Sequence, residues 1–533
     1  MRRSIGIQRQ QLAAAICLLA AAAVCLAGCS GEPGQLGLDS GSDSQAAQAS
    51  PSTETTESWS SLFIGGVKVG HAHTTERFFV ENDQPLVETE RSSEMSLRRD
   101  SQATNTSSKV SCVETRDGQL VRFRSEMRVA GAPLIVTGVV NGNTLNFEVE
   151  SQGQKQRQEM PWRPTWGGLF AAERSLLSKP MKPGQRRELK SLWVLDFPRL
   201  ADDVLVAGDE EQTQLLDGPR KLQRIEMTTQ IGAQRIQTTS WTDAAGEVVK
   251  SQMQMGELQI DSYRTTKEEA LKESDGAVFD LFKAANVRVE QRLDRPHATR
   301  KVVYRARLAK GDPQQAFVVT ASQSVKPIDE RTVEITVTAL RPETKLDSPF
   351  ASPPPTEADL KPNALIQSDD PKILALADEA APREKDPWKV ALALEEFVDD
   401  YIDKTNFSVA LATAAEVAQT HRGDCTEHAM LLAALCRARK IPARLAVGLV
   451  YFPQGDAGAF AYHMWTEVWI DDRWIPIDAT LAQGGIGAAH LTVAESNLDG
   501  GGSIDAFLPV QRVIGDLKLE IVEQQTADQD EAR

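Results

Sequence analysis

The sequence predicts a multi-domain α+β protein, in which an N-terminal antiparallel β-rich region precedes a C-terminal α+β domain. With 533 residues the chain is too long for one ordinary domain. Apolar and polar residues alternate through most of residues 59–265, as in strands with one buried face. From residue 363 onward the pattern changes to capped helices that are followed by short strands.

The first 28 residues predict an export signal, because basic residues precede an apolar run from Leu12 to Ala27. The run ends in Leu26-Ala27-Gly28-Cys29, which resembles a bacterial lipobox and implies cleavage before Cys29 and acylation of its thiol. An ordinary signal peptide or a short membrane helix is the alternative. We expect a lipid-anchored protein of the bacterial cell envelope, with its body in the periplasm and a flexible stalk over residues 29–58.

Residues 59–265 predict a β-rich domain with one inserted helix. Leu62 to Gly70 contains a Gly-Gly turn between two strands. A helix is expected from Gly168 to Leu177, before Pro180. We expect a large, curved, half-open antiparallel sheet. Its other predicted strands are 120–129, 134–140, 144–150, 221–230 and 233–241.

Residues 266–340 predict a small α/β linker domain. The segment from Lys267 to Val287 is expected to be helical at both ends. The prolines of residues 341–362 predict a semi-rigid connector. Strands of the linker domain are expected at 302–308, 316–320 and 332–339.

Residues 363–500 predict four helices followed by an antiparallel sheet. Asp370-Pro371 and Asp386-Pro387 each place a capping side chain before a proline at the first helical position. Thr413 with Glu416 forms a capping box. Residues 501–533 are expected to add a last strand at 517–522 and a polar tail. The fourth helix is expected at 425–439, and the strands at 444–452, 463–470 and 473–477.

Charge and cysteine usage limit the classes of function. A net charge of -16 argues against nucleic acid as a partner. Beyond Cys29 the chain keeps Cys112, Cys425 and Cys436. The last two lie about 16 Å apart on one predicted helix, too far for a disulfide. A free cysteine in an oxidising compartment is expected to be buried or used, and Cys436 is expected in the core.

The start of the fourth predicted helix carries a candidate nucleophile. Cys425 follows the turn Arg422-Gly423-Asp424. Backbone N–H groups and the positive end of the helix dipole favour a thiolate there and could stabilise an oxyanion. A neighbouring imidazole would lower the thiol pKa further and protonate the leaving group.

His463 and Asp478 supply that imidazole and a carboxylate, if the hairpin between them has an even loop. With Asp471-Asp472 as a two-residue loop, Asp478 lies opposite Trp465, on the face that carries His463. Diagonal neighbours of this kind are about 7–8 Å apart, which both side chains can bridge. A three-residue loop would turn Asp478 to the opposite face.

These segments resemble the transglutaminase-like core, one of the papain-like cysteine enzymes, over residues 371–480. By this resemblance Cys425 is the nucleophile, His463 the base and acid, and Asp478 the group that orients His463. It implies a protein or peptide substrate, no cofactor and no metal. Trp388 lies in the first turn of a helix, so we do not assign it the family's oxyanion role. The matching segments are Gly-Asp-Cys-Thr-Glu-His-Ala (423–429), Arg-Lys-Ile-Pro-Ala-Arg (439–444), His-Met-Trp-Thr-Glu-Val (463–468) and Trp-Ile-Pro-Ile-Asp-Ala-Thr (474–480).

The sequence predicts thiol-dependent acyl transfer on a peptide or isopeptide amide. Hydrolysis and transamidation share one acyl-enzyme, and the residues do not choose between them. A catalytically silent binding or scaffold protein is the alternative, although all three residues are present. A zinc site made from Cys425, His428, His421 and His463 is a third reading, but no second paired-ligand motif accompanies it. For Glu427 and His428, a helix-surface position and a supporting role both stay open.

Overall fold

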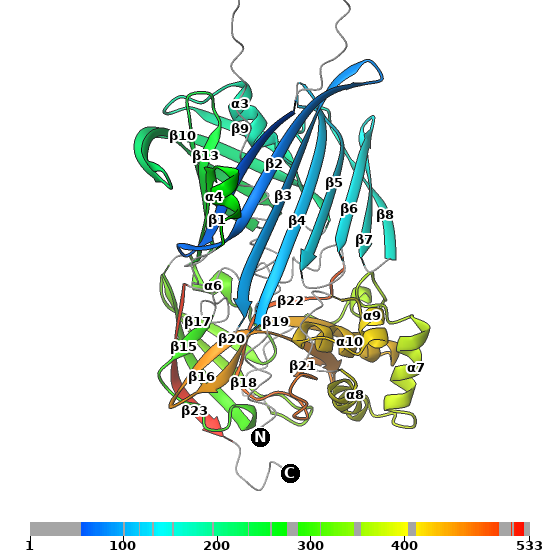
Figure 1. Cartoon of the computed structure of the whole chain (residues 1–533). Helices are drawn as coiled ribbons and strands as arrows, with labels where there is room; N and C mark the ends of the chain where they lie inside the picture. Colours follow the sequence, from blue (N-terminus) through cyan, green and yellow to red (C-terminus); the bar gives the residue numbers. More distant parts are fainter. Residues whose placement is uncertain are drawn as a thin grey trace, which may run out of the picture.

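The chain folds into three antiparallel sheets and a group of helices (Figure 1). The computed structural model describes residues 55–526, except 100–101, 117, 130–132, 152–153, 195–196, 233, 256–257, 274–285, 310, 346–352, 403–411, 500–512 and 514–515. The predicted signal peptide, the acylation site Cys29, nearly all of the stalk and the end of the tail lie outside the described residues. Within the described residues, no helix is long and apolar enough to cross a membrane.

The predicted large sheet is present, as an antiparallel sheet of 14 described strands in the order β8-β7-β6-β5-β4-β3-β2-β1-β14-β13-β12-β11-β10-β9. Its first and last strands in sequence pair in the middle, with Trp59 opposite Thr265. Gly65 and Gly66 both have positive φ at the predicted turn between β1 and β2. The strands are β1 (Thr55–Ile64), β2 (Val67–Glu81), β3 (Gln84–Arg99), β4 (Gln102–Thr115), β5 (Leu120–Val129), β6 (Leu134–Asn141), β7 (Thr144–Ser151), β8 (Gln154–Pro161), β9 (Arg186–Val194), β10 (Pro198–Leu215), β11 (Gly218–Ile231), β12 (Gln234–Thr242), β13 (Val248–Met255) and β14 (Leu258–Thr265).

Helix α3 (Ala171–Ser178), the predicted inserted helix, shows that this sheet is strongly curved. Its Glu173 accepts hydrogen bonds from Arg91 on β3. Its Ser175 accepts from Arg187 on β9, at the far end of the strand order. One short helix can contact both strands only because the sheet wraps around it. The large sheet is therefore a curved shell with α3 inside.

The linker region and the predicted C-terminal strand, β23, together form a smaller sheet in the order β17-β18-β16-β23. Two details of its prediction are wrong. The strand expected at 316–320 is absent, because Asp312 caps a short helix that begins at Pro313 and ends at Ala316; residues 317–320 lie in neither a helix nor a strand. Val287 is not helical, because it begins a strand that pairs elsewhere; 274–285 lie outside the described residues. The elements are α4 (Lys267–Leu271), η1 (Pro296–Ala298), β16 (Thr299–Leu308), α6 (Pro313–Ala316), β17 (Gln323–Asp329), β18 (Thr332–Thr338), η2 (Glu357–Asp359) and β23 (Leu517–Thr526).

The predicted helices follow, with α10 at their centre. Asp370 and Asp386 cap α7 and α8 through their side chains, and Thr413 with Glu416 forms the expected capping box of α9. Helices α7, α8 and α9 all pack against α10, whose residues are buried from its start through Arg437. The helices are α7 (Pro371–Ala380), α8 (Pro387–Tyr401), α9 (Ala414–Thr420) and α10 (Cys425–Ala438).

The third sheet has the order β15-β20-β19-β22, with β21 also paired to β20. Strands β15 and β21 share one edge of β20: β15 pairs with residues 458–460 and β21 with residues 466–470. Among the described strands none pairs with residues 461–465 on that edge, so the sheet has a gap there. The strands are β15 (Val287–Val289), β19 (Ala443–Gln454), β20 (Ala457–Ile470), β21 (Arg473–Ile477) and β22 (His490–Ser496).

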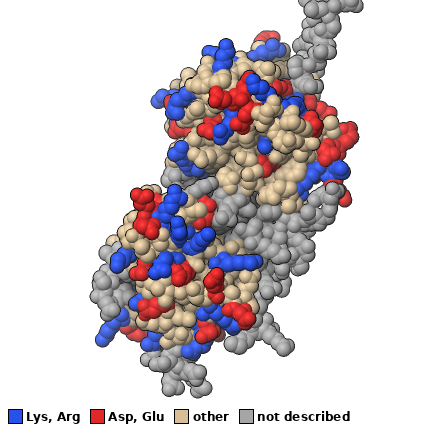
Figure 2. All heavy atoms as spheres, turned by 90° about the vertical axis from the view of Figure 1, so that its left-hand side faces the viewer, with Lys and Arg blue, Asp and Glu red and all other residues tan. Residues whose placement is uncertain are grey.

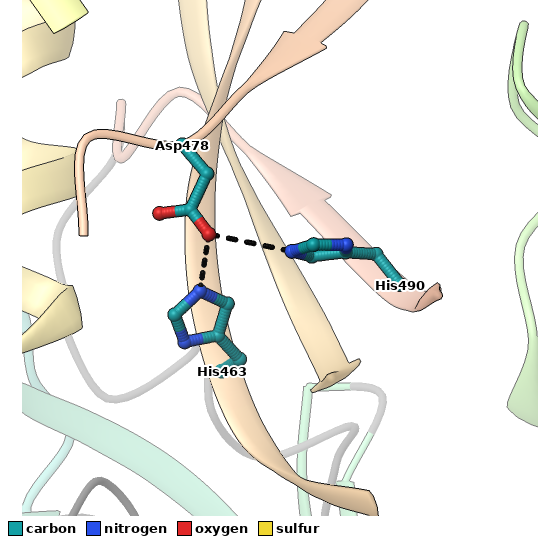
Figure 3. A group of neighbouring side chains, drawn as sticks. All are labelled: His463, Asp478 and His490. Carbon is teal, nitrogen blue, oxygen red and sulfur yellow. Dashed lines mark hydrogen bonds and ion pairs between the residues drawn. The ribbon is translucent and has the colours of Figure 1, made fainter. Parts of the chain in front are cut away.

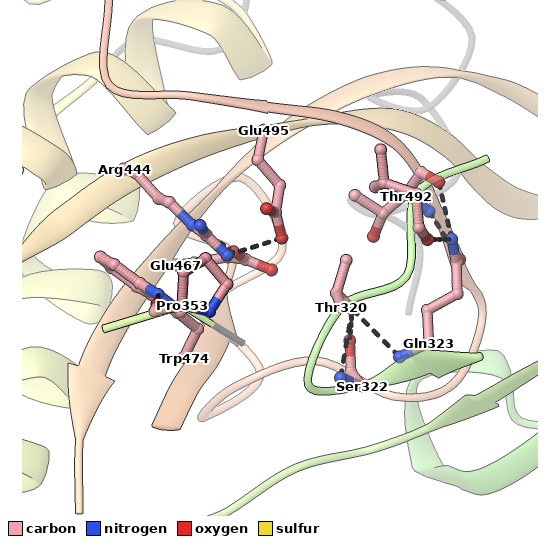
Figure 4. Close-up of polar contacts among 10 residues, drawn as sticks. Thr320, Ser322, Gln323, Pro353, Arg444, Glu467, Trp474, Thr492 and Glu495 are labelled. Atoms are coloured by element: carbon pink, nitrogen blue, oxygen red, sulfur yellow. Dashed lines mark hydrogen bonds and ion pairs between the residues drawn. The ribbon is translucent and has the colours of Figure 1, made fainter. Parts of the chain in front are cut away.

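Apolar and polar contacts join these parts. Leu62 of the large sheet and Leu431 of α10 belong to one continuous buried cluster. Gln323 of β17 exchanges two hydrogen bonds with the backbone of Thr492 on β22, and the Trp474 indole donates to the Pro353 carbonyl (Figure 4). The connector and the small sheet are therefore fastened to the third sheet.

A buried cation lies between two carboxylates in the same region. Arg444 donates to Glu467 at 2.8 Å and to Glu495 at 2.6 Å, and its guanidinium stacks over Trp474 (Figure 4). Burial and the neighbouring Glu467 raise the pKa of Glu495 to about 8. On the face in Figure 2, by contrast, basic and acidic side chains are interspersed at the surface. Exposed ion pairs also occur, such as Arg305–Glu520.

Arg437, near the end of α10, ties distant segments together. It is fully buried and donates to the carbonyls of Ala443 (3.0 Å), Lys361 (2.9 Å) and Asn497 (3.3 Å). These carbonyls belong to the start of β19, the connector and the chain after β22. Burial lowers the pKa of Arg437 to about 10, so it remains a cation at neutral pH.

Replacing Arg437 by methionine is expected to lower the free energy of unfolding by about 3 kcal/mol, because buried carbonyls lose their donors. Urea denaturation followed by tryptophan fluorescence measures this. The control is Lys372→Met at an exposed position of α7, expected to change stability by less than about 0.5 kcal/mol. Equal midpoints for the two variants would contradict the assigned role of Arg437.

Candidate active site

The segment before α10 is shaped to present Cys425 as the first helical residue. Asp424 is the N-cap and accepts from the backbone N–H of Thr426. Glu427 accepts from the backbone N–H of Asp424, which completes a capping box. Gly423 cannot carry a side chain, because a Cβ there would lie 2.1 Å from the Cβ of Glu427. The sequence Gly-Asp-Cys-Thr-Glu is thus a helix start built around the thiol.

The thiol of Cys425 lies against the gap in the edge of β20. Ile470 and Arg473 flank the two-residue turn, so the backbone groups of Ile470 point toward β21. Backbone groups alternate in direction along a strand, so the N–H and C=O of Met464 point to the same edge as those of Ile470. Met464 lies in the gap, so no described strand pairs with these groups. The Met464 N–H instead donates to the Cys425 sulfur. The thiol therefore lies one residue along the strand from His463.

The expectation that the helix start favours a thiolate is wrong for this structure. Cys425 has 0% of its surface exposed, and burial, followed by the charge of Asp424, raises the thiol pKa well above its usual value. The N–H groups of Thr426 and Glu427 are already bonded to the Asp424 carboxylate. The cap thus brings a negative charge to the helix end where the thiolate would form. At rest, Cys425 is a neutral thiol.

His463 and Asp478 form a hydrogen bond, as expected for a two-residue hairpin loop. Ile470 pairs with Arg473 across the Asp471-Asp472 turn, in which both residues have positive φ. His463 Nε2 lies 2.7 Å from Asp478 Oδ2, and both side chains are buried. A carboxylate only accepts, so the proton is on Nε2 and the neutral ring keeps its lone pair on Nδ1.

The Asp478 carboxylate is held ionised although it is buried. Burial by itself would raise the pKa of Asp478, but the two imidazoles beside it, His463 first and then His490, hold this pKa well below its usual range. Asp478 Oδ1 accepts from the backbone N–H of Thr480 at 2.9 Å. Figure 3 shows both imidazoles converging on the other oxygen, from strands β20 and β22.

Two contributors to this site were missed at the sequence level. His490, the first residue of β22, places Nε2 3.3 Å from Asp478 Oδ2. Trp465 stacks on His463 with ring centroids 6.1 Å apart and meets His490 edge-on at 5.1 Å. The alternating apolar residues after His490 were the available sign of a strand, but nothing local linked that strand to Asp478.

Glu395 of α8 is the third missed residue. It is buried, and its carboxylate accepts from the backbone N–H of Asp478 at 2.8 Å and from that of Gly485 at 3.1 Å. Burial raises the pKa of Glu395 to about 7. Glu395 lies on a different element, far in sequence from the motifs, so the motifs did not predict its contact with Asp478. Glu395 fixes the backbone that carries Asp478.

The zinc reading is not supported by the placement of its residues. His421 is exposed and stacks on Tyr401, whereas His428 is buried with Nδ1 2.6 Å from the Asp424 carbonyl. Glu427 and His428 are both buried, so the helix-surface option is excluded. Within the described residues, the ligand-type atoms that do converge are those of His463, Asp478 and His490, within 4.8 Å of one another. We interpret that group as hydrogen-bonded and assign no metal to it. This group shares only His463 with the zinc site considered from the sequence.

Comparison with known proteins now identifies the class. Residues 374–479 match the sequence model of the transglutaminase-like superfamily, and they form a transglutaminase-like core domain. This confirms the resemblance from the motifs. No curated protein has a sequence that matches the chain.

Several solved structures are distantly similar. A β-barrel-like protein with a DUF1849 domain from Brucella abortus shares 10% identity over 40% of this chain and 96% of its own, with a TM-score of 0.30. A proposed cysteine protease from Cytophaga hutchinsonii shares 16% identity over 46% and 85%, with a TM-score of 0.26. The hypothetical lipoprotein YmcC from Escherichia coli shares 16% identity over 41% and 90%, with a TM-score of 0.18. The family assignment rests on the sequence match.

Replacing Glu395 by glutamine is expected to change the pH dependence of stability. The pKa of Glu395 is raised from 4.5 to about 7, so between these values the folded protein binds a proton that the unfolded chain releases. This group therefore lowers stability as pH rises through that window, by up to about 3 kcal/mol. Relative to Glu395→Gln, the wild type should lose stability from about pH 4.5 to about pH 7 and then level off.

Urea denaturation at several pH values, with the exposed neighbour Glu396→Gln as control, measures this difference. A stability difference between wild type and Glu395→Gln that does not vary with pH would show that the carboxyl is not shifted.

Proposed function

We propose that the transglutaminase-like domain transfers the acyl group of a peptide or isopeptide amide to the thiol of Cys425. The observation that carries the proposal is the buried His463–Asp478 hydrogen bond beside the helix start that presents this thiol. This bond uses Nε2 of His463, so a proton exchanged with sulfur would pass through Nδ1.

The reaction follows from that proton balance. His463 Nδ1 takes the thiol proton as sulfur attacks the amide carbonyl carbon, and a tetrahedral intermediate forms. The imidazolium then gives the proton to the leaving nitrogen, the C–N bond breaks and a thioester remains. Asp478 stabilises the imidazolium through Nε2–H and stays ionised. Water or a second amine resolves the thioester, giving hydrolysis or transamidation.

The raised pKa of Cys425 favours proton transfer to His463 during the attack over a thiolate formed beforehand. Because the thiol is fully buried, covering side chains must also move before substrate reaches it. We further propose that the chain is a lipoprotein of the bacterial envelope, anchored through Cys29, and that the N-terminal sheets position substrate or partner. The lipobox-like sequence Leu26-Ala27-Gly28-Cys29 supports the anchor.

One observation favours a second candidate, a binding or scaffold protein without turnover. The same burial that raises the Cys425 pKa would isolate the thiol permanently if the site never opened. The two functions differ in whether a thioester forms, so trapping of that thioester separates them.

Incubation of the soluble body with a peptide library is expected to give a mass adduct of one acyl group in intact-mass spectrometry. Cys425→Ala should abolish the adduct because sulfur is the nucleophile. Cys436→Ala, a second buried cysteine on the same helix, is the matched control and should keep it. No adduct in the wild type would favour the scaffold function, and an adduct that survives in Cys425→Ala would show that Cys425 is not the nucleophile.

Asp478→Asn is expected to lower kcat by about 10²–10⁴-fold with little change in KM, because the imidazolium loses its charged partner. The control is Asp472→Asn, at a positive-φ turn position that asparagine tolerates. That variant should stay within about twofold of wild type. Steady-state kinetics on a peptide found in the trapping experiment measures both, and equal loss in the two variants would count against the role of Asp478.

A further inference from the structure

One oxygen of Asp478 serves two histidines. Asp478 Oδ2 lies 2.7 Å from His463 Nε2 and 3.3 Å from His490 Nε2. Because an ionised carboxylate has no proton to give, both rings must donate, and both carry their proton on Nε2. His463 and His490 therefore compete for the same negative charge (Figure 3).

His490 is built into the site rather than placed there by chance. It has 1% of its surface exposed and pairs with Val450 across β19 and β22. The edge of its ring meets Trp465, which also stacks on His463. A single tryptophan thus fixes the two imidazoles relative to each other.

The groups around His490 keep it neutral. Burial lowers its pKa, and this outweighs the hydrogen bond and charge of Asp478, which raise it; His463 lowers it further, and a hydrogen bond with the Gly487 backbone raises it. His297, on the neighbouring η1 turn, is the other titratable group that interacts with it, and the pKa of His297 is lowered to about 4. Glu395 of α8 lies behind Asp478 and bonds the backbone of that residue, not the His490 ring. His490 is therefore an uncharged donor.

We propose that His490 is a positioning residue: its Nε2–H takes part of the Asp478 negative charge and thereby sets how strongly Asp478 holds a proton on His463. The inference rests on the acyl-transfer function proposed above. With two donors on one oxygen, each hydrogen bond is weaker than it would be alone. Without His490, the carboxylate would attract the imidazolium of His463 more strongly. His463 would then be a stronger base but a weaker acid toward the leaving amine.

Two variants separate the donor from the bulk of the ring. His490→Phe keeps an aromatic ring against Trp465 and removes the donor. His490→Gln places an amide N–H near the position of Nε2 and keeps a donor. The titration midpoint of His463, followed by NMR with ¹⁵N-labelled histidine in the full soluble body, is expected to rise by about half to one pH unit in His490→Phe. In His490→Gln it should return to within about 0.2 pH unit of wild type, by the same relation.

The kinetic readout follows the same direction. The acid limb of kcat/KM should move to higher pH by the same amount in His490→Phe, and kcat should fall about 3–10-fold while KM stays similar. His490→Gln should recover most of kcat. A merely structural role would lower activity in both variants without moving the acid limb.

The NMR titration decides the inference even without turnover. An unmoved His463 midpoint in a folded His490→Phe variant overturns it. So does a wild-type spectrum in which His490 carries its proton on Nδ1, a result that needs no His490→Phe protein to fold. A raised midpoint in a wild-type-like fold that forms no acyl-enzyme supports the role of His490 in the hydrogen bond and refutes the proposed function alone.

Discussion

The buried carboxylate of Asp478 is the interaction on which the rest of the site depends. An ionised group inside a protein is costly unless hydrogen bonds surround it. Here His463, His490 and the Thr480 N–H donate to its oxygens, while Glu395 holds its backbone. These partners come from α8, β20, β22 and the end of the hairpin. The carboxylate thereby joins elements that are distant in sequence, and it also selects the tautomer in which His463 can act as a base.

The position of Cys425, the proposed nucleophile, depends on a different constraint, the gap in the edge of β20. Strand β15 covers one part of this edge and β21 another, so the start of α10 can reach the Met464 N–H between them. Because β15 comes from residues 287–289, the linker region completes the sheet of the transglutaminase-like domain. The regions before the transglutaminase-like core therefore contribute directly to its construction, whatever else they bind.

In this structure the thiol of Cys425 is buried and uncharged. Burial raises the pKa of Cys425 most, and the negative charge of Asp424, which caps the helix start, raises it further. A neutral thiol is protected from unwanted oxidation, since the thiolate is the reactive form. The proposed reaction therefore has two requirements. The site must open, and His463 must remove the thiol proton during the attack.

The sequence by itself determined the local features: the capped starts of α7, α8 and α9, the start of α10 at Cys425, the Asp471-Asp472 turn, and with it the face that Asp478 shares with His463. Caps and two-residue turns depend on residues that are neighbours in sequence, so they can be predicted from a single sequence. Only the tertiary structure decided that His490 and Glu395 meet Asp478, that Val287 pairs with Phe460, and that burial outweighs the helix end at Cys425. Those outcomes depend on long-range packing and desolvation, which no local pattern encodes.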